Sequence, residues 1–232
     1  MSLSANLARS PNCEVKSKYA VLAIRFVTFA YHHHEIKILL LKINQSEKWK
    51  FPTGQIRSEE SITEAAERII CEITKAKDLF FHQIGVMESS PIDDSVVYIN
   101  YYVMVRWTAN MTSKIMENYR WFAIHRQPPL MGDNGTLLKN AHAALIKGLN
   151  YHPIGYFLLY KHFTLGELQN LYEQILAIKL NNSKFRRKML AQFILRKLND
   201  QQISATAKAS DLYKYDKGQY FAALQTGLEK VL

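Results

Sequence analysis

The residues of this chain best suited to chemistry lie on one short segment, between Trp49 and Glu72. Carboxylates gathered on one helix face can hold Mg²⁺, which takes oxygen ligands in near-octahedral geometry. Positions 69, 72 and 73 would share such a face, because residues three and four apart are neighbours on a helix. Two of these positions are Ile69 and Ile73, which offer no ligand and make the face apolar. The sequence therefore predicts neither a metal site nor a catalytic residue here.

The spacing of this segment resembles that of a Nudix box. Gly54 is followed at the family spacing by Glu60, and Glu60 by Arg68. The family then carries R-E-x-x-E-E, where this chain reads Arg68-Ile69-Ile70-Cys71-Glu72-Ile73. A hydrolase is expected to keep those glutamates, whereas a protein that only binds nucleotides or sugars can lose them. The resemblance, over residues 16–150, therefore implies a Nudix-like domain that senses a small metabolite without hydrolysing it.

The resemblance also locates the expected metabolite site. The effector is expected in a cleft bordered by five residues: Phe51, Gln55, Glu60, Arg68 and Glu72. Pairing of Glu60 with Arg68 would in addition brace the loop on the helix. No cofactor is expected.

A second cluster of chemical interest is a basic segment in the C-terminal part. Residues 151–232 carry 12 Lys and Arg against 6 Asp and Glu. Between Glu173 and Asp200 there is no acidic residue, but there are seven basic ones: Lys179, Lys184, Arg186, Arg187, Lys188, Arg196 and Lys197. A one-sided segment of this kind suits a polyanionic partner. The alternative is a solvated basic helix face.

Strand and helix patterns alternate in the part that holds the box. Aliphatic, aromatic and β-branched residues at 19–29 and 36–43 predict a hairpin, whose three turn histidines are expected to be structural or solvent-exposed. Apolar residues at three- and four-residue steps predict a helix over 58–76. Further elements are expected as strands at 80–88, 96–107 and 119–124, a turn at 90–94 and a helix at 136–149. This mixture predicts an α/β domain, with helices packed on a mixed sheet.

A second unit is expected over residues 151–232, joined without a Gly/Ser-rich linker and hence packed or closely connected. Thr164 and Glu167 form a capping-box pattern at the start of a helix that runs to Ala177. Asn181-Asn182-Ser183 signals a second cap.

The helix after that second cap is predicted over 183–192. It places Phe185, Met189 and Phe193 on one side, and its basic residues on another. Candidate strands at 193–198 and 212–215 follow, around a polar loop at 199–210. Helix, short turn, helix and β-hairpin are the layout of a winged helix.

Two motifs of this second unit match one family of regulators. They read Phe163-Thr164-Leu165-x-Glu167-Leu168-Gln169-x-Leu171-Tyr172-Glu173 and Phe185-Arg186-Arg187-Lys188. In this respect the chain resembles the NrtR-like transcriptional regulators, which join a Nudix-like sensor to a C-terminal winged helix. The resemblance implies a homodimer that binds a palindromic double-stranded DNA operator. It also implies a small-molecule effector, either a sugar or an ADP-ribose-like compound.

The resemblance implies that the helix at 183–192 enters the major groove, with its N-terminal residues nearest the base edges. Contacts to DNA are expected from eight residues: Thr164, Asn182, Ser183, Lys184, Arg186, Arg187, Lys188 and Lys208. The chain departs from the family in the wing, where Thr206-Ala207-Lys208-Ala209-Ser210 stands in place of a basic stretch. It also departs after the last sheet strand, where Asp133-Asn134 stands in place of an aspartate–histidine pair.

Composition sets the remaining expectations. No apolar run approaches the roughly 18 residues of a transmembrane helix, and the polar start has no signal core. We therefore expect a cytoplasmic protein without a membrane partner, whose residues 1–15 are disordered. Cys13 and Cys71 are too few for a disulfide framework or a zinc site. Two other functions stay open: a divergent Nudix hydrolase of a nucleoside diphosphate compound with an accessory domain, and a C-terminal protein-interaction module.

Overall fold

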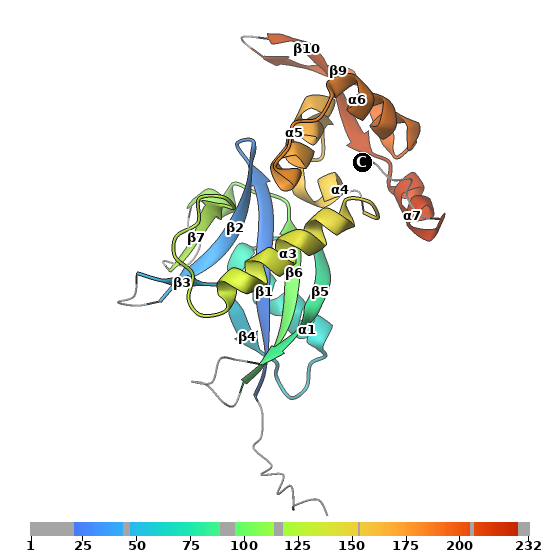
Figure 1. The fold of residues 1–232 in the computed structure, drawn as a ribbon. Coiled ribbons are helices and arrows are strands. Elements are labelled where there is room, and N and C mark those ends of the chain that lie inside the picture. The colour runs from blue at the N-terminus through green and yellow to red at the C-terminus, as the bar shows by residue number, and fades with distance from the viewer. Residues whose placement is uncertain are drawn as a thin grey trace, which may run out of the picture.

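Two β-sheets organise the chain in the computed structural model, one in each half of the sequence (Figure 1). The structure describes residues 21–43, 47–88, 96–113, 118–152, 154–204 and 207–226. Residues 1–15 and the turn expected at 90–94 therefore lie outside the described residues. Among the helices of the described ranges, none has the length and apolar character needed to cross a membrane.

The larger sheet is mixed, as predicted. Its main path runs β3-β2-β1-β6-β5, with β4 paired to β1 and β7 paired to β2. The central pair, β1 and β6, is parallel from Val21↔Val96 to Phe29↔Met104, and the other pairings are antiparallel. The strands are β1 (Val21–His32), β2 (Glu35–Lys42), β3 (Trp49–Lys50), β4 (Thr53–Gln55), β5 (Leu79–Glu88), β6 (Val96–Val105) and β7 (Tyr119–Ala123).

Helices cover both faces of this sheet, because β1 carries apolar side chains on both sides. Its Ile24 and Phe26 belong to the core cluster that includes α1 (Ile62–Thr74), whereas Val27 and Phe29 belong to the cluster that includes α3 (Asn134–Gly148). This follows the period of two along a strand. Figure 1 shows α3 across one face and α1 behind the other. A short helix, α2 (Asn110–Ser113), precedes β7.

The predicted β1–β2 hairpin is confirmed, with a two-residue loop. His33 and His34 have φ values of 51° and 60°, the left-handed values that a type I′ hairpin loop requires at both positions. His32 is still part of β1, and its ring stacks on Trp107 with centroids 4.1 Å apart. The three histidines are thus divided between a strand and its turn.

The smaller sheet has the order β8-β10-β9 and belongs to a winged helix. The prediction of a polar loop at 199–210 is wrong. Both strands of the hairpin extend into this segment and pair from Ala207↔Ser204 to Tyr215↔Leu195. Backbone pairing carries polar residues into these strands without requiring a buried face. The elements are α4 (Ile154–Leu158), β8 (Phe163–Thr164), α5 (Leu165–Leu176), α6 (Asn182–Ala191), β9 (Leu195–Ser204), β10 (Ala207–Tyr215) and α7 (Lys217–Thr226).

The two halves pack directly on each other, as the absence of a flexible linker predicts. One hydrophobic cluster runs from the α3 side of the large sheet into α4 and α5, and includes Tyr102, Leu158 and Leu168. Polar contacts accompany it. Arg106 Nε donates to Leu159 O at 2.8 Å, and a ring nitrogen of His142 lies 2.7 Å from Ile175 O.

Candidate functional site

The basic helix α6 is fixed by its cap and by its buried side. The Asn181 side chain accepts a 3.0 Å hydrogen bond from Lys184 N, which satisfies one of the free amides at the helix start. Phe185 and Met189 are buried, and the Phe185 ring meets Tyr172 of α5 edge-on at 5.3 Å. Phe193, predicted on the same side as Phe185 and Met189, is instead 77% exposed, because the helix ends at Ala191 and Phe193 has a φ of 55°.

The turn between α5 and α6 is held by a polar network that sequence reasoning missed. Glu173 accepts hydrogen bonds from Lys179 Nζ at 2.7 Å, Leu180 N at 3.0 Å and Gln169 Nε2 at 2.9 Å. These bonds, led by that from Lys179, lower the pKa of Glu173 to about 2. Gln169 also donates to Leu180 O at 3.0 Å. Gln169 and Glu173 both belong to the motif at residues 163–173. That motif is the sequence signal that could have revealed this network.

Six predicted DNA-contacting residues gather on the exposed surface of α6: Asn182, Ser183, Lys184, Arg186, Arg187 and Lys188. Three other basic residues of the segment are paired internally, Lys179 with Glu173, Arg196 with Asp216 and Lys197 with Asp211. Within the described ranges, no ion pair is formed by the four cations of α6. Helix α6 therefore presents four uncompensated positive charges to solvent.

Two of the eight predicted contacts, Asn182 and Thr164, have partners within the protein. Asn182 Nδ2 donates to Gln169 Oε1 at 3.0 Å, so this amide braces α6 on α5. The Thr164 hydroxyl forms the predicted capping box with Glu167, accepting from its backbone N at 3.1 Å. Lys208 belongs to β10, but its side chain lies outside the described residues.

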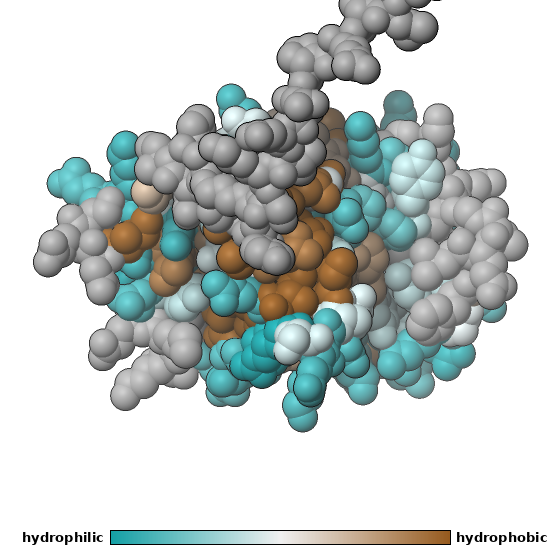
Figure 2. Space-filling view, turned by 90° about the horizontal axis from the view of Figure 1, so that it is seen from below, coloured by the Kyte–Doolittle hydropathy of each residue, from teal (hydrophilic) through white to brown (hydrophobic). Residues whose placement is uncertain are grey.

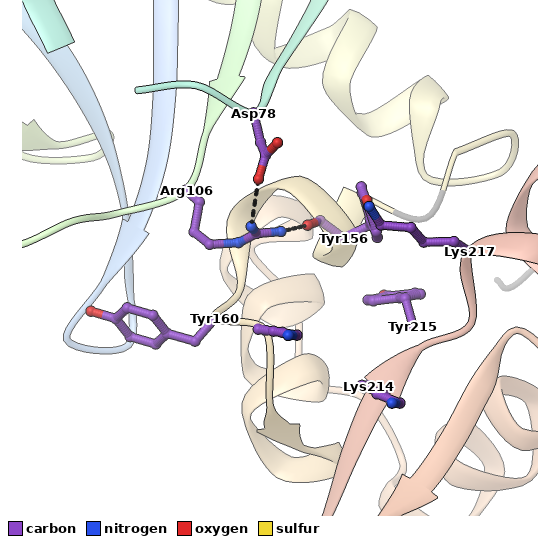
Figure 3. A pocket seen from close by; sticks show the side chains of 8 residues that line it. Asp78, Arg106, Tyr156, Tyr160, Lys214, Tyr215 and Lys217 are labelled. Atoms are coloured by element: carbon purple, nitrogen blue, oxygen red, sulfur yellow. Dashed lines mark hydrogen bonds and ion pairs between the residues drawn. The ribbon is translucent and has the colours of Figure 1, made fainter. Parts of the chain in front are cut away.

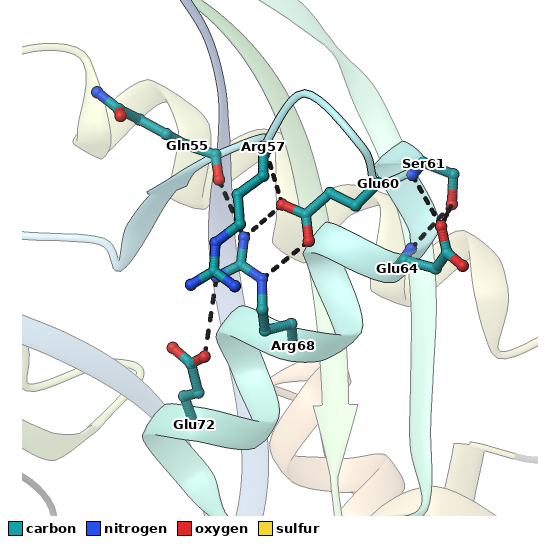
Figure 4. A network of polar contacts seen from close by, with 7 residues as sticks. All are labelled: Gln55, Arg57, Glu60, Ser61, Glu64, Arg68 and Glu72. Atoms are coloured by element: carbon teal, nitrogen blue, oxygen red, sulfur yellow. Dashed lines mark hydrogen bonds and ion pairs between the residues drawn. The ribbon is translucent and has the colours of Figure 1, made fainter.

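The Nudix-box residues form a network centred on Arg68 (Figure 4). Arg68 binds both carboxylate oxygens of Glu60, at 2.9 and 2.5 Å, and donates to Gln55 O at 3.2 Å. Glu60 also accepts from Arg57 N at 2.7 Å. The Arg68 hydrogen bonds are the largest cause of a lowered Glu60 pKa, about 2. The expected Glu60–Arg68 brace is therefore present and ties the β4–α1 loop to the helix.

The helix face beside this network does not fit a magnesium site. Ile69 and Ile73 are 5% and 7% exposed. Ile69 covers Gly54 so closely that a Cβ added to Gly54 would lie 2.4 Å from Ile69 Cδ1. Glu72 is exposed, and its carboxylate lies 3.8 Å from Arg68 Nη1. Across the described ranges, no group of three or more His, Cys, Asp or Glu side chains could hold a metal ion.

Four of the five predicted effector residues are thus brought together, and Phe51 is not. Its side chain is fully buried in the core cluster on the α3 side of the sheet, away from the cluster that holds Ile69. Phe51 lies near the other box residues in sequence, but its large apolar ring is buried in the core and does not join them. Phe51 N donates to Asn134 Oδ1 at 3.0 Å, so this residue links the segment between β3 and β4 to α3.

A buried ion pair close to the start of α3 was also missed. Arg25 is 4% exposed and binds both carboxylate oxygens of Asp133, at 2.6 and 2.8 Å. Its Nε donates to Asn100 Oδ1 at 2.9 Å. The Arg25 hydrogen bonds lower the pKa of Asp133. Asp133 and Asn134 therefore hold α3 against the sheet.

An apolar surface lies at the end of the sheet near the box. Figure 2 shows hydrophobic side chains gathered on this face, with hydrophilic ones around them. Val21, Leu22, Ile62 and Val86 are between 40% and 58% exposed. Leu22 O accepts from Ile56 N at 3.4 Å, so this end of β1 lies beside the β4–α1 loop. Exposed apolar surface of this kind can receive a ring or a partner surface.

Comparisons with known proteins agree with this architecture. Residues 155–215 match the family model of the NrtR DNA-binding winged helix domain. The ADPR responsive transcriptional repressor NtrR of Acinetobacter baylyi is 24% identical over 217 residues, covering 88% of this chain and 86% of the relative.

Two solved structures are similar over most of the chain. NrtR of Shewanella oneidensis, complexed with a 27mer DNA, has a TM-score of 0.74 at 22% identity, covering 86% of this chain and 95% of that one. A MutT/nudix family protein of Enterococcus faecalis has a TM-score of 0.68 at 16% identity, covering 87% and 90%. The predicted fold, a Nudix-like sheet with flanking helices followed by a winged helix, is confirmed.

Proposed function

We propose that this chain, an NrtR-like protein that joins a Nudix-like domain to a winged helix, is a DNA-binding transcriptional regulator that senses a small metabolite. The observation that carries the proposal is the charge of α6. Four cations without internal partners stand on the exposed surface of a helix whose opposite side is anchored by Phe185 and Met189. A helix held in this way can enter the major groove of DNA.

The proposed contacts divide into two kinds. Arg186 and Arg187 carry the planar fork that can bind guanine through two hydrogen bonds, while Lys184 and Lys188 suit phosphates. Ser183 and the first amides of α6 suit a backbone phosphate, because a helix N-terminus favours anions. Thr164, Asn182 and Lys208 remain predicted contacts, with Asn182 and Thr164 also serving the fold.

The proposed effector is an ADP-ribose-like compound. Support comes from the Acinetobacter baylyi relative, which is named for its response to ADPR. The site combines the polar network of Gln55, Glu60, Arg68 and Glu72 with the neighbouring apolar surface, which offers room for a base or sugar ring. A sugar effector is the alternative that the sequence leaves open.

We also propose that the Nudix-like domain has no hydrolase activity. Catalysis of this type needs a metal ion to polarise the phosphates. Ile69 and Ile73 occupy two of the three positions where the family carries glutamates, and both are buried. Glu72 is left as a lone carboxylate beside Arg68, which already pairs with Glu60.

For the oligomeric state and the location of the protein in the cell, the proposal follows the expectations from the sequence. We propose a cytoplasmic homodimer that binds a palindromic operator, with residues 16–150 as the sensing domain and 151–232 as the DNA-binding domain. The effector would act by binding two dimer arrangements with different affinity, and so change how well two winged helices span the half-sites.

Selection of bound genomic fragments by the full-length protein tests this function. We expect enrichment of a palindromic site and at least a fivefold change in operator affinity when ADP-ribose is added. A protein that enriches no sequence, or that enriches the same fragments after Arg187→Ala and Lys188→Ala, would contradict the assignment. An operator whose affinity responds only to sugars would overturn the proposed effector and leave the DNA-binding function intact.

A further inference from the structure

Two adjoining hollows lie at the junction between the two domains, away from α6 and from the Nudix box. The first, about 270 Å³, is lined from the Nudix-like side by Asp78 and Arg106, and from the winged helix by residues of α4, β10 and α7 (Figure 3). The second, about 300 Å³, shares Asp78 and Arg106 and adds Lys75, Lys77 and Thr108. Together they form a groove that we call the junction groove.

The junction groove is strongly cationic. Six basic residues line it, Lys75, Lys77, Arg106, Lys161, Lys214 and Lys217, against one acidic residue, Asp78. Asp78 is already held by Arg106, whose Nη1 lies 3.1 Å from its carboxylate. Over the part of the chain that the structure describes, no ion pair is formed by Lys161, Lys214 or Lys217. Net positive charge of this density in a concave site attracts anions.

Arg106 has a different task from the lysines. Besides Asp78, its guanidinium donates to the backbone carbonyls of Leu159 and Tyr156, so it fastens β6 to the α4 region. Arg106 therefore builds the groove, while Lys161, Lys214 and Lys217 remain available at its rim.

We propose that the junction groove binds a small phosphorylated molecule, at a site separate from the effector site of the Nudix box. Phosphate oxygens match the lysine ammonium groups, and the exposed ring of Tyr160 offers a face for an attached organic group. A DNA duplex, whose major groove alone is about 12 Å wide, is too broad to enter hollows of this size. Because both domains line the groove, the ligand stabilises one placement of the winged helix against the Nudix-like sheet.

Calorimetric titration of the full-length protein with inorganic pyrophosphate tests the site. The variant carries Lys161→Gln and Lys214→Gln, and the matched control carries Lys139→Gln and Lys147→Gln, two exposed lysines of α3. Wild type and control are expected to bind saturably with a Kd below about 1 mM. The groove variant is expected to bind at least tenfold more weakly, with the same urea midpoint. Equal binding by all three proteins, or no saturable binding by the wild type, overturns the proposal.

A second arm separates a small phosphorylated ligand from the phosphates of DNA. Without pyrophosphate, the groove variant and the control should bind DNA equally at every salt concentration. If the groove lysines contact the DNA backbone instead, the groove variant loses DNA affinity, and the slope against log salt falls by about 1.8 for two phosphates. That result, together with absent pyrophosphate binding, would overturn the small-molecule site and leave the regulator function standing.

Discussion

The Tyr31 hydroxyl donates a 2.8 Å hydrogen bond to Asn170 Oδ1, and so joins β1 of the Nudix-like domain to α5 of the winged helix. Tyr31 is 7% exposed, and its burial raises the pKa of its phenol. The bond sits at the tip of the β1–β2 hairpin, on the first helix of the helix–turn–helix. In the proposed regulator, this bond is a direct polar link along which a change in the Nudix-like domain can reach the winged helix.

Tyr31→Phe should weaken the response to effector more than it weakens DNA binding. Loss of one hydrogen bond with a partly buried partner costs about 1 kcal/mol of unfolding free energy. We expect operator affinity without ADP-ribose to change less than twofold, while the change caused by ADP-ribose shrinks several-fold. Fluorescence anisotropy with labelled operator measures both quantities.

Tyr101→Phe is the matched control for that change, because the Tyr101 hydroxyl faces Gln83 within the Nudix-like sheet. It should leave the ADP-ribose response at the wild-type value. An unchanged response in Tyr31→Phe would show that this bond is not part of the coupling.

The network around Glu173 predicts a dependence of stability on pH. Its pKa in the folded protein is about 2, below the ordinary value of 4.5. A depressed carboxyl pKa contributes stability that is present above pH 4.5 and is lost as the pH falls towards 2. Glu173→Gln should therefore be less stable than wild type at pH 7, and the difference should shrink between pH 4.5 and 2.

Urea unfolding at several pH values measures this difference, and Glu59→Gln, at an exposed position before α1, serves as the control. The control should follow the wild-type curve throughout. A Glu173→Gln curve parallel to wild type down to pH 2 would contradict the assigned role of the Glu173 carboxylate.

Sequence reasoning reached the architecture because the local signals and the packing agree. The capping box of Thr164 and Glu167, the apolar stripe of α1 and the hairpin around His33 all appear in the structure. The part of β9 after residue 198 and the part of β10 before residue 212 were not predicted, because no alternating apolar pattern marks these polar segments.

The site residues were harder to predict, because their positions depend on contacts between residues that are far apart in the sequence. Arg25 meets Asp133 across 108 positions, and nothing near either residue in sequence indicates the other. Phe51 shows the opposite error: adjacency to the box implied a ligand contact, but the ring is buried on the other side of the sheet. Periodicity places a residue on a face, but only the assembled fold shows what covers that face.

Restoring a family carboxylate should not restore a metal site. Ile69→Glu places a charge where the side chain is 5% exposed and packs on Gly54. We expect a loss of about 2 kcal/mol or more in unfolding free energy, because a buried polar group without partners costs about that much. Ile69→Val, the control, should cost about 1 kcal/mol.

Urea unfolding with and without Mg²⁺, together with an ADP-ribose hydrolysis assay, measures this outcome. We expect no stabilisation by Mg²⁺ and no turnover in the variant or in the wild type. Mg²⁺-dependent turnover by the wild type that Glu72→Gln abolishes would favour the divergent hydrolase instead.

Thr164→Ala should destabilise the winged helix by removing the cap of α5. The Thr164 hydroxyl accepts from Glu167 N at 3.1 Å, and loss of such a cap typically costs about 1 kcal/mol. Thr164→Ser keeps the hydroxyl and should retain most of the stability. Thermal unfolding of the three proteins checks the order, and equal midpoints for alanine and serine would contradict the capping role.

Salt-dependent DNA binding is the most direct test of the central claim, that α6 is the DNA-reading helix. Operator affinity would be measured from low to high salt for wild type, for Arg187→Ala with Lys188→Ala, and for a control with Lys139→Ala and Lys147→Ala. We predict at least tenfold weaker binding by the α6 variant, and a slope against log salt smaller by up to about 1.8, with the control unchanged. Identical affinity and slope for all three proteins would contradict the account and make α6 a solvated face of a protein-interaction module.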